Sequence, residues 1–161
     1  MLAGPVYSAG VTESAGVTES TVQRIPPPVT GASRPFWTGG AQRQLLILWC
    51  GTCERWAHPP RETCPGCGGA LAPRAVSGRG SVFTFTVNHH AFNPAVPVPY
   101  VIAIVELEEQ GGLRFTTNIV GCDPEAVRIG MPVQVDFEPA GEAWVPVFRP
   151  AGPATSEKTA S

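Results

Sequence analysis

The sequence predicts a mainly β protein, in which a small zinc ribbon precedes a five-stranded barrel with the OB fold. Two Cys-x2-Cys pairs lie between positions 50 and 67, with ten residues between the pairs, and this spacing is typical of a ribbon. Five strand-like segments follow between positions 82 and 148. Only 15% of the residues are charged, whereas 18 glycines and 18 prolines occur among 161 residues. Such a composition favours short strands and turns over long surface helices.

The two ends of the chain are expected to be unstructured. The hexapeptide AGVTES occurs at 9–14 and again at 15–20, and three prolines follow at 26–28. These residues offer little apolar surface to bury, although a partner-docking arm is an alternative interpretation. The predicted organisation is a disordered arm (1–34), a short helix and ribbon (35–74), an OB-fold domain (75–150) and a disordered tail (151–161).

The first ordered segment is expected to begin at Pro35. Proline is favoured in the first turn of a helix, but Gly39 and Gly40 weaken a helix at this place. The apolar run from Leu45 to Trp49 then predicts a strand that leads into the first cysteine pair.

The two cysteine pairs predict a closed metal site. Each pair places two thiolates on one side of a tight turn, and two such turns together form a tetrahedron of four sulfur ligands with no open position. The predicted ligands are Cys50, Cys53, Cys64 and Cys67. We expect one structural zinc ion per chain, although four thiolates also accept iron. A redox dithiol at positions 64 and 67 is disfavoured, since no βαβ pattern surrounds it. His58 is a candidate fifth ligand, but four thiolates already fill the coordination shell of the metal.

The five barrel strands are expected at 82–87, 100–106, 113–120, 132–137 and 144–148. Alternation in the first segment is imperfect, and the second is a near-continuous apolar run, as in a strand covered on both sides. Before the fourth strand, Asp123 is suited to cap a short helix with Pro124 at its first position.

Other chemistry-bearing residues form no catalytic set. His89, His90 and Asn93 follow the first barrel strand and are suited to line a ligand passage, to act in proton transfer or simply to be solvated. Cys122 is interpreted as a buried structural thiol. The carboxylates of Glu106, Glu108 and Glu109 are interpreted as solvated. No Gly-rich phosphate loop of the Walker or dinucleotide type is present.

The charge argues against a nucleic-acid partner. The net charge is −2, and residues 75–149 hold four arginines against eight carboxylates. A groove that follows phosphates should instead be basic. No uninterrupted apolar stretch of about 18 residues predicts a membrane span. The first residues do not follow the pattern of a secretory signal, so a reducing, cytoplasmic location is expected.

Several segments together resemble one family. They are the stretch from PFW to the first cysteine pair, AHPPRETCPGCGG, SGRGSVFTFTVNHHAFNPAVPVPYVIAIVEL and VGCDPEAVRIGMPVQVDFE. The chain resembles, from about 35 to 150, the acyl-CoA-associated family that joins a rubredoxin-like zinc ribbon to an OB fold. That family has long been catalogued as a domain of unknown function. Some of its members are fused to a hydratase-like domain, and the resemblance implies no such activity for these residues.

The resemblance implies a non-catalytic accessory subunit that docks on a thiolase-like enzyme and helps to form its acyl-CoA site. Within that class it favours an aldolase or thiolase of steroid side-chain degradation. The alternatives are a free-standing acyl-CoA binding protein and an OB-fold nucleic-acid binder. The substrate-passage candidates are His89, His90, Asn93 and Tyr100. The partner-interface candidates are Phe36, Trp37, Trp49 and Trp56, which are equally suited to pack the ribbon onto the barrel.

Overall fold

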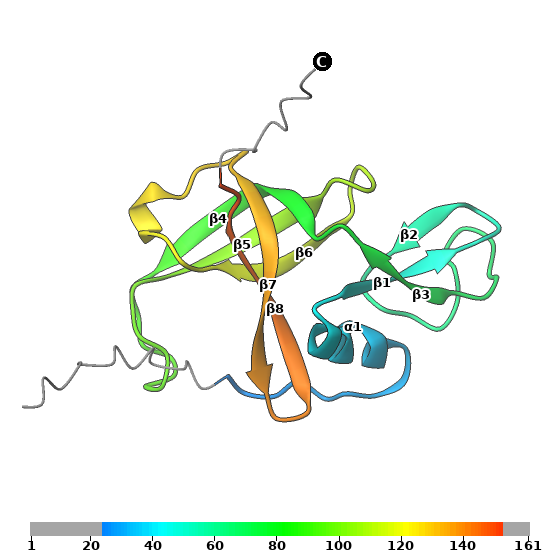
Figure 1. The fold of residues 1–161 in the computed structure, drawn as a ribbon, viewed down its shortest axis with the longest axis horizontal. Helices are drawn as coiled ribbons and strands as arrows, with labels where there is room; N and C mark the ends of the chain where they lie inside the picture. Colours follow the sequence, from blue (N-terminus) through cyan, green and yellow to red (C-terminus); the bar gives the residue numbers. More distant parts are fainter. Residues whose placement is uncertain (1–23, 153–161) are drawn as a thin grey trace, which may run out of the picture.

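A computed structural model describes residues 24–152. The duplicated AGVTES segments of the predicted arm, and all but two residues of the predicted tail, lie outside the described residues. Figure 1 shows a three-stranded ribbon at one end of the molecule and a barrel at the other, with a short helix beside both. No helix within residues 24–152 has the length and hydropathy needed to cross a membrane.

The ribbon is a three-stranded antiparallel sheet in the order β2-β1-β3. Its strands are β1 (Leu45–Cys50), β2 (Arg55–Ala57) and β3 (Ala72–Val76). The central strand β1 has the predicted apolar run, and Leu45, Ile47 and Leu48 are buried. Because β1 ends at Cys50, the strand connects the buried residues Leu45 and Ile47 directly to the first cysteine pair.

The barrel is closed in the order β4-β5-β6-β8-β7. Its strands are β4 (Arg79–Asn88), β5 (Tyr100–Leu107), β6 (Arg114–Ile119), β7 (Pro132–Ala140) and β8 (Ala143–Pro150). All pairs are antiparallel except β6 with β8, which join in parallel at the single pair Ile119 and Phe148. Five strands closed in this way confirm the predicted OB fold. The short helix that Asp123 caps is a 3-10 turn, η3 (Pro124–Ala126), and the Asp123 side chain accepts a hydrogen bond from the Glu125 amide.

The structure explains the imperfect alternation of the first barrel strand and shows that the apolar second strand is fully buried on one face and half-buried on the other. The register of β4 against β5 shifts between Val82 and Thr84, and the residue between them, Phe83, is 43% exposed. On β5, Val101, Ala103 and Val105 are fully buried, whereas the isoleucines between them are half-buried. A bulge therefore explains the imperfect pattern of β4.

Residues 24–44 join the two parts. They form η1 (Gly31–Ser33), α1 (Arg34–Thr38) and η2 (Gly39–Gln42), preceded by an irregular segment in which Val29 is buried. The two glycines that weaken the helix have a packing role. A Cβ atom on Gly40 would lie 2.4 Å from the Cβ of Trp144 and 2.6 Å from a ring atom of Phe137. At this position the chain lies so close to β7 and β8 that only glycine fits.

Candidate functional site

The four predicted metal ligands lie together at one end of the ribbon. The sulfur atoms of Cys50, Cys53, Cys64 and Cys67 all lie within 4.8 Å of one another. The separations are 3.6 Å between Cys50 and Cys67 and 3.8 Å between Cys53 and Cys64. Four sulfurs at the usual Zn–S bond length around one ion would be about 3.8 Å apart. The donor set therefore fits a tetrahedral zinc ion.

Backbone amides complete the two turns that hold the sulfurs. The amide of Cys53 donates to the Cys50 sulfur, and the amides of Gly66 and Gly69 donate to the sulfurs of Cys64 and Cys67, each at 3.4 Å. Such bonds stabilise the thiolate form, which is the form that binds a metal. A Cβ atom on Gly69 would lie 3.2 Å from the Cys67 sulfur, so glycine lets the chain pass close to it.

The four thiols influence one another's protonation. Hydrogen bonds from the backbone amides of Cys67 and Gly66 lower the pKa of Cys64 to about 6. The hydrogen bonds with the sulfurs of Cys67 and Cys64 raise the pKa of Cys53 to about 12. One thiolate forms readily in this cluster, but several adjacent thiolates need a cation to offset their repulsion.

An aromatic cluster connects the ribbon to the barrel. The ring of Phe36 lies 4.7 Å from Trp37, 5.2 Å from His58 and 5.8 Å from Phe115 of β6. Phe36 is 6% exposed. Burial lowers the pKa of His58 to about 4, and the charge of Arg61 adds to the shift, so this histidine is neutral near pH 7. Phe36 thus packs the helix between ribbon and barrel.

A second contact joins the ribbon to the barrel through the loop after β5. The Gln110 side chain accepts a hydrogen bond from the Trp56 amide at 2.9 Å and donates one to the Trp56 carbonyl at 3.4 Å. A single amide side chain therefore pairs with β2 in the way a neighbouring strand would.

We expect a Gln110→Ala substitution to destabilise the protein by about 1 kcal/mol or somewhat more, since it leaves two half-buried backbone groups without their partner. Urea-induced unfolding is the measurement. A Gln134→Ala variant is the matched control, because Gln134 makes one exposed hydrogen bond, to the Ser77 carbonyl. Equal stabilities of the two variants would contradict a clamping role for Gln110.

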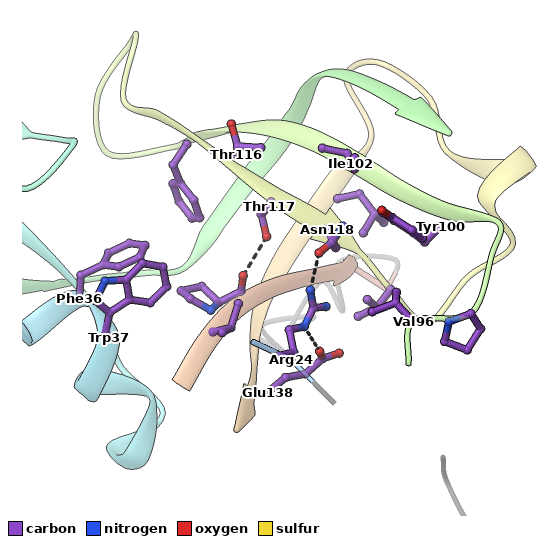
Figure 2. A pocket seen from close by; sticks show the side chains of 16 residues that line it. Arg24, Phe36, Trp37, Val96, Tyr100, Ile102, Thr116, Thr117, Asn118 and Glu138 are labelled. Atoms are coloured by element: carbon purple, nitrogen blue, oxygen red, sulfur yellow. Dashed lines mark hydrogen bonds and ion pairs between the residues drawn. The ribbon is translucent and has the colours of Figure 1, made fainter. Parts of the chain in front are cut away.

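The described residues also form an apolar pocket of about 490 Å³. It lies where β6 and β8 part, since these strands pair only at Ile119 and Phe148. Phe36 and Trp37 of α1 close one side, and Val96, Pro97 and Tyr100 close another (Figure 2). The other lining residues are Arg24, Ile102, Phe115, Thr116, Thr117, Asn118, Ile119, Val120, Glu138, Val145 and Pro146.

The polar side chains at the pocket form an ion pair and hydrogen bonds with one another and with the backbone. The Arg24 side chain forms an ion pair with Glu138 and donates to the Asn118 side chain at 2.6 Å (Figure 2). The Thr117 hydroxyl donates to the Pro146 carbonyl at 2.9 Å and so bridges the gap between β6 and β8. Among residues 24–152, the pocket lining includes no cysteine, histidine, serine or lysine. An apolar pocket with a few placed polar groups is suited to binding a ligand, not to activating a nucleophile.

The structure separates the substrate-passage candidates. Tyr100 lines the apolar pocket, and Asn93 lines an adjoining hollow with Arg24, Ile25 and Val96. His89 and His90 are exposed and line neither.

Among the interface candidates, Phe36 is buried, whereas Trp37, Trp49 and Trp56 are half-buried. Trp49 and Trp56 pack edge to face with each other at 4.9 Å on the ribbon sheet.

The remaining candidates have structural surroundings. Cys122 is half-buried against the core, and burial raises the pKa of its thiol. The hydrogen bond from Arg114 lowers the pKa of Glu106, and Glu108 pairs with Arg79. The ionised form of Glu106 is thereby stabilised, which suits a surface ion pair and not a general acid.

Comparison with known proteins identifies the family. Residues 37–72 match the rubredoxin-like zinc ribbon domain of ChsH2, and residues 73–138 match its C-terminal OB-fold domain. A solved structure titled "Ltp2-ChsH2(DUF35) aldolase" is 40% identical with a TM-score of 0.71, and the match covers 79% of this chain and 100% of that one. The chain belongs to the DUF35 family of ChsH2-like proteins.

Curated relatives of this DUF35 chain have two kinds of name. A "DUF35 domain-containing scaffold protein" of Methanocaldococcus jannaschii is 42% identical over 63% of this chain and 73% of its own length. A "Probable enoyl-CoA hydratase alpha subunit" of Thermomonospora curvata is 43% identical over 80% of this chain. A "3-oxo-4,17-pregnadiene-20-carboxyl-CoA hydratase alpha subunit" of Mycobacterium tuberculosis is 51% identical over 38% of this chain. The chain spans 40% and 19% of the lengths of these two hydratase subunits.

Proposed function

We propose that this chain is a non-catalytic accessory subunit, which docks on a thiolase-like acyl-CoA enzyme and helps to form its acyl-CoA site. The observation that carries the proposal is the apolar pocket between α1, the loop before β5 and the barrel. The pocket is large enough to hold part of an acyl group, yet the part of its lining that the structure describes holds no candidate nucleophile paired with a base. Such a site positions a substrate without contributing a reacting group.

The relatives support a role as a subunit. One is named a scaffold protein, and the solved relative carries the name "Ltp2-ChsH2(DUF35) aldolase", which supports assembly with a second protein. The steroid carboxyl-CoA in another relative's name supports an acyl-CoA of a sterol side chain as the ligand of the complex. A cytoplasmic location is part of the proposal, because a reducing compartment keeps the four cysteines available for zinc.

Each part of the chain has a separate task in this proposal. One zinc ion at the four cysteines holds the ribbon in shape, because a module of this size has too small a core to fold alone. The aromatic cluster around Phe36 fixes the ribbon to the barrel. One wall of the acyl-CoA passage is then formed by the end of the β4–β5 loop and the start of β5, at Val96, Pro97 and Tyr100.

Two alternatives give different results in simple assays. A free-standing acyl-CoA binding protein would bind acyl-CoA tightly when isolated and would form no stable complex. An OB-fold nucleic-acid binder would bind single-stranded DNA or RNA in a strongly salt-dependent way, which the excess of carboxylates over arginines in the barrel disfavours.

We expect a Thr116→Trp substitution to raise the KM of the assembled enzyme for a long-chain acyl-CoA about tenfold without preventing assembly. Thr116 is an exposed lining residue of the pocket, and an indole at this place would occupy part of it. The matched control is Thr84→Trp, since Thr84 is an exposed strand residue outside the pocket lining. Unchanged kinetics of the Thr116→Trp enzyme would show that the pocket is not part of the acyl-CoA site.

Joint replacement of His89 and His90 by alanine is expected to weaken substrate handling only modestly.

Isolation of the tagged full-length chain from its native cells tests the subunit role. We expect a thiolase-fold protein to co-purify in a fixed ratio, at moderate salt, and to stay bound through size-exclusion chromatography. Recovery of the chain alone, at native expression level, would contradict the proposal.

A further inference from the structure

Three exposed apolar side chains lie next in sequence to residues that line the pocket or the adjoining hollow. Phe92 is 77% exposed, Val98 is 39% exposed and Ile25 is 79% exposed. Phe92 and Val98 belong to the loop between β4 and β5, and Ile25 follows the Arg24 that lines the pocket. We call these three residues the docking rim.

Each member of the docking rim lines a hollow or is next in sequence to a residue that lines one: Phe92 precedes Asn93, and Val98 follows Pro97. Ile25 lines a shallow hollow together with Asn93 and Val96, the latter from the loop that carries Phe92. Val96 also lines the apolar pocket, together with Arg24. The loop therefore forms pocket wall at Val96 and Pro97 and exposes the apolar side chains of Phe92 and Val98 on either side of this stretch.

The loop is held in shape by its own contacts. The Asn88 side chain donates to the His90 carbonyl at 2.6 Å, and the ring of Phe92 lies 4.6 Å from that of His90. The Asn93 side chain accepts a hydrogen bond from the Ala95 amide at 3.0 Å. Three prolines in the loop further reduce its conformational freedom. Phe92 is thus presented in a fixed conformation, which lowers the entropy lost when a partner covers it.

The chemistry of the loop also differs from that of an ordinary solvated loop. Residues 88–99 contain no Asp, Glu, Lys or Arg. Depletion of charge around an aromatic anchor is characteristic of the core of a protein interface. A partner that completes the pocket has to reach the residues that line it, and the docking rim adjoins Arg24, Asn93 and Pro97, which line the pocket or the hollow beside it.

We propose that the docking rim is the surface on which the thiolase-like subunit seats, with Phe92 as the central anchor in an uncharged apolar recess of that subunit. This inference rests on the proposed function and specifies which face carries it out. It assigns the β4–β5 loop two linked tasks: its exposed residues Phe92 and Val98 bind the partner, and Val96 and Pro97 shape the pocket that the two subunits share.

The test measures binding of the full chain to the purified thiolase-fold subunit that co-purifies with it. Phe92→Ala is expected to weaken binding about 30-fold, which corresponds to about 2 kcal/mol. Val98→Asp, which places a charge in the interface, is expected to weaken it at least as much. Phe83→Ala is the matched control, because Phe83 is an exposed phenylalanine on β4 that stacks on Arg114. Its binding is expected to equal that of the unmodified chain.

Zinc content and thermal unfolding check that each variant is folded, as expected for side chains this exposed. If Phe92→Ala and Val98→Asp bind the partner as tightly as the unmodified chain does, the docking rim is not the binding surface. The accessory-subunit proposal would not be affected by that result. An equal loss in Phe83→Ala would also overturn the assignment to this loop. Absence of any thiolase-fold partner would overturn both proposals.

Discussion

A Cys64→Ser substitution is expected to remove the metal from the protein and to unfold the ribbon. The Cys64 sulfur accepts hydrogen bonds from backbone amides and lies 3.8 Å from the sulfur of Cys53, so its loss opens the tetrahedron. A neutral hydroxyl does not replace a thiolate as a zinc ligand. In small zinc modules, the free energy of metal binding is also the free energy of folding. Complex formation with the partner is expected to be lost as well.

The measurement is the metal content of the purified protein, together with its near-ultraviolet circular dichroism, which reports the packed pair Trp49 and Trp56. The control is Cys122→Ser, because Cys122 lies outside the group of four close sulfurs. We expect one zinc per chain in the control. A fully folded unmodified protein without metal, or one with a Cys64–Cys67 disulfide, would show that the cluster is not a structural zinc site.

A Phe36→Ala substitution is expected to reduce the free energy of unfolding by about 3–5 kcal/mol, as for other fully buried phenylalanines. The Phe36 ring contacts Trp37, His58 and Phe115, which come from the helix, the ribbon and the barrel. Its removal leaves a cavity at the point where three parts of the fold meet. Phe36→Leu keeps most of the volume and is expected to cost about 1–1.5 kcal/mol.

Chemical denaturation followed by tryptophan fluorescence measures this effect. Phe83→Ala serves as the exposed control and is expected to cost less than about 1 kcal/mol, mostly through the lost stacking on Arg114. A loss below about 1 kcal/mol in Phe36→Ala would mean that the helix does not hold the ribbon on the barrel.

The metal centre and the barrel could be predicted from the sequence because both depend on short-range patterns. Two cysteine pairs with glycines beside them determine the local turns, and the structure brings the four sulfurs together as predicted. The strands between 82 and 148 follow from alternation and from turn residues. The register shift at Phe83 coincides with a break in that alternation, but the break alone does not identify a bulge.

The pocket could not be predicted from such patterns. Arg24 and Glu138 are 114 positions apart, and nothing local indicates that they pair. The segment 24–34 was predicted as part of an arm, yet Arg24 lines the pocket and Val29 is buried. The pocket itself exists because β6 and β8 pair at one position and then part, which is a property of strand closure and not of any motif. The role of Gly40 likewise depends on Trp144, a distant neighbour.

Reconstitution from purified subunits tests the central proposal most directly. The chain and its thiolase-like partner are mixed, and the cleavage of an acyl-CoA substrate is followed for the mixture and for each component alone. We expect no turnover by the chain, little by the partner, and a large increase when both are present, which is lost with Cys64→Ser. Full activity of the partner alone, or turnover by the isolated chain, would contradict the role of an accessory subunit.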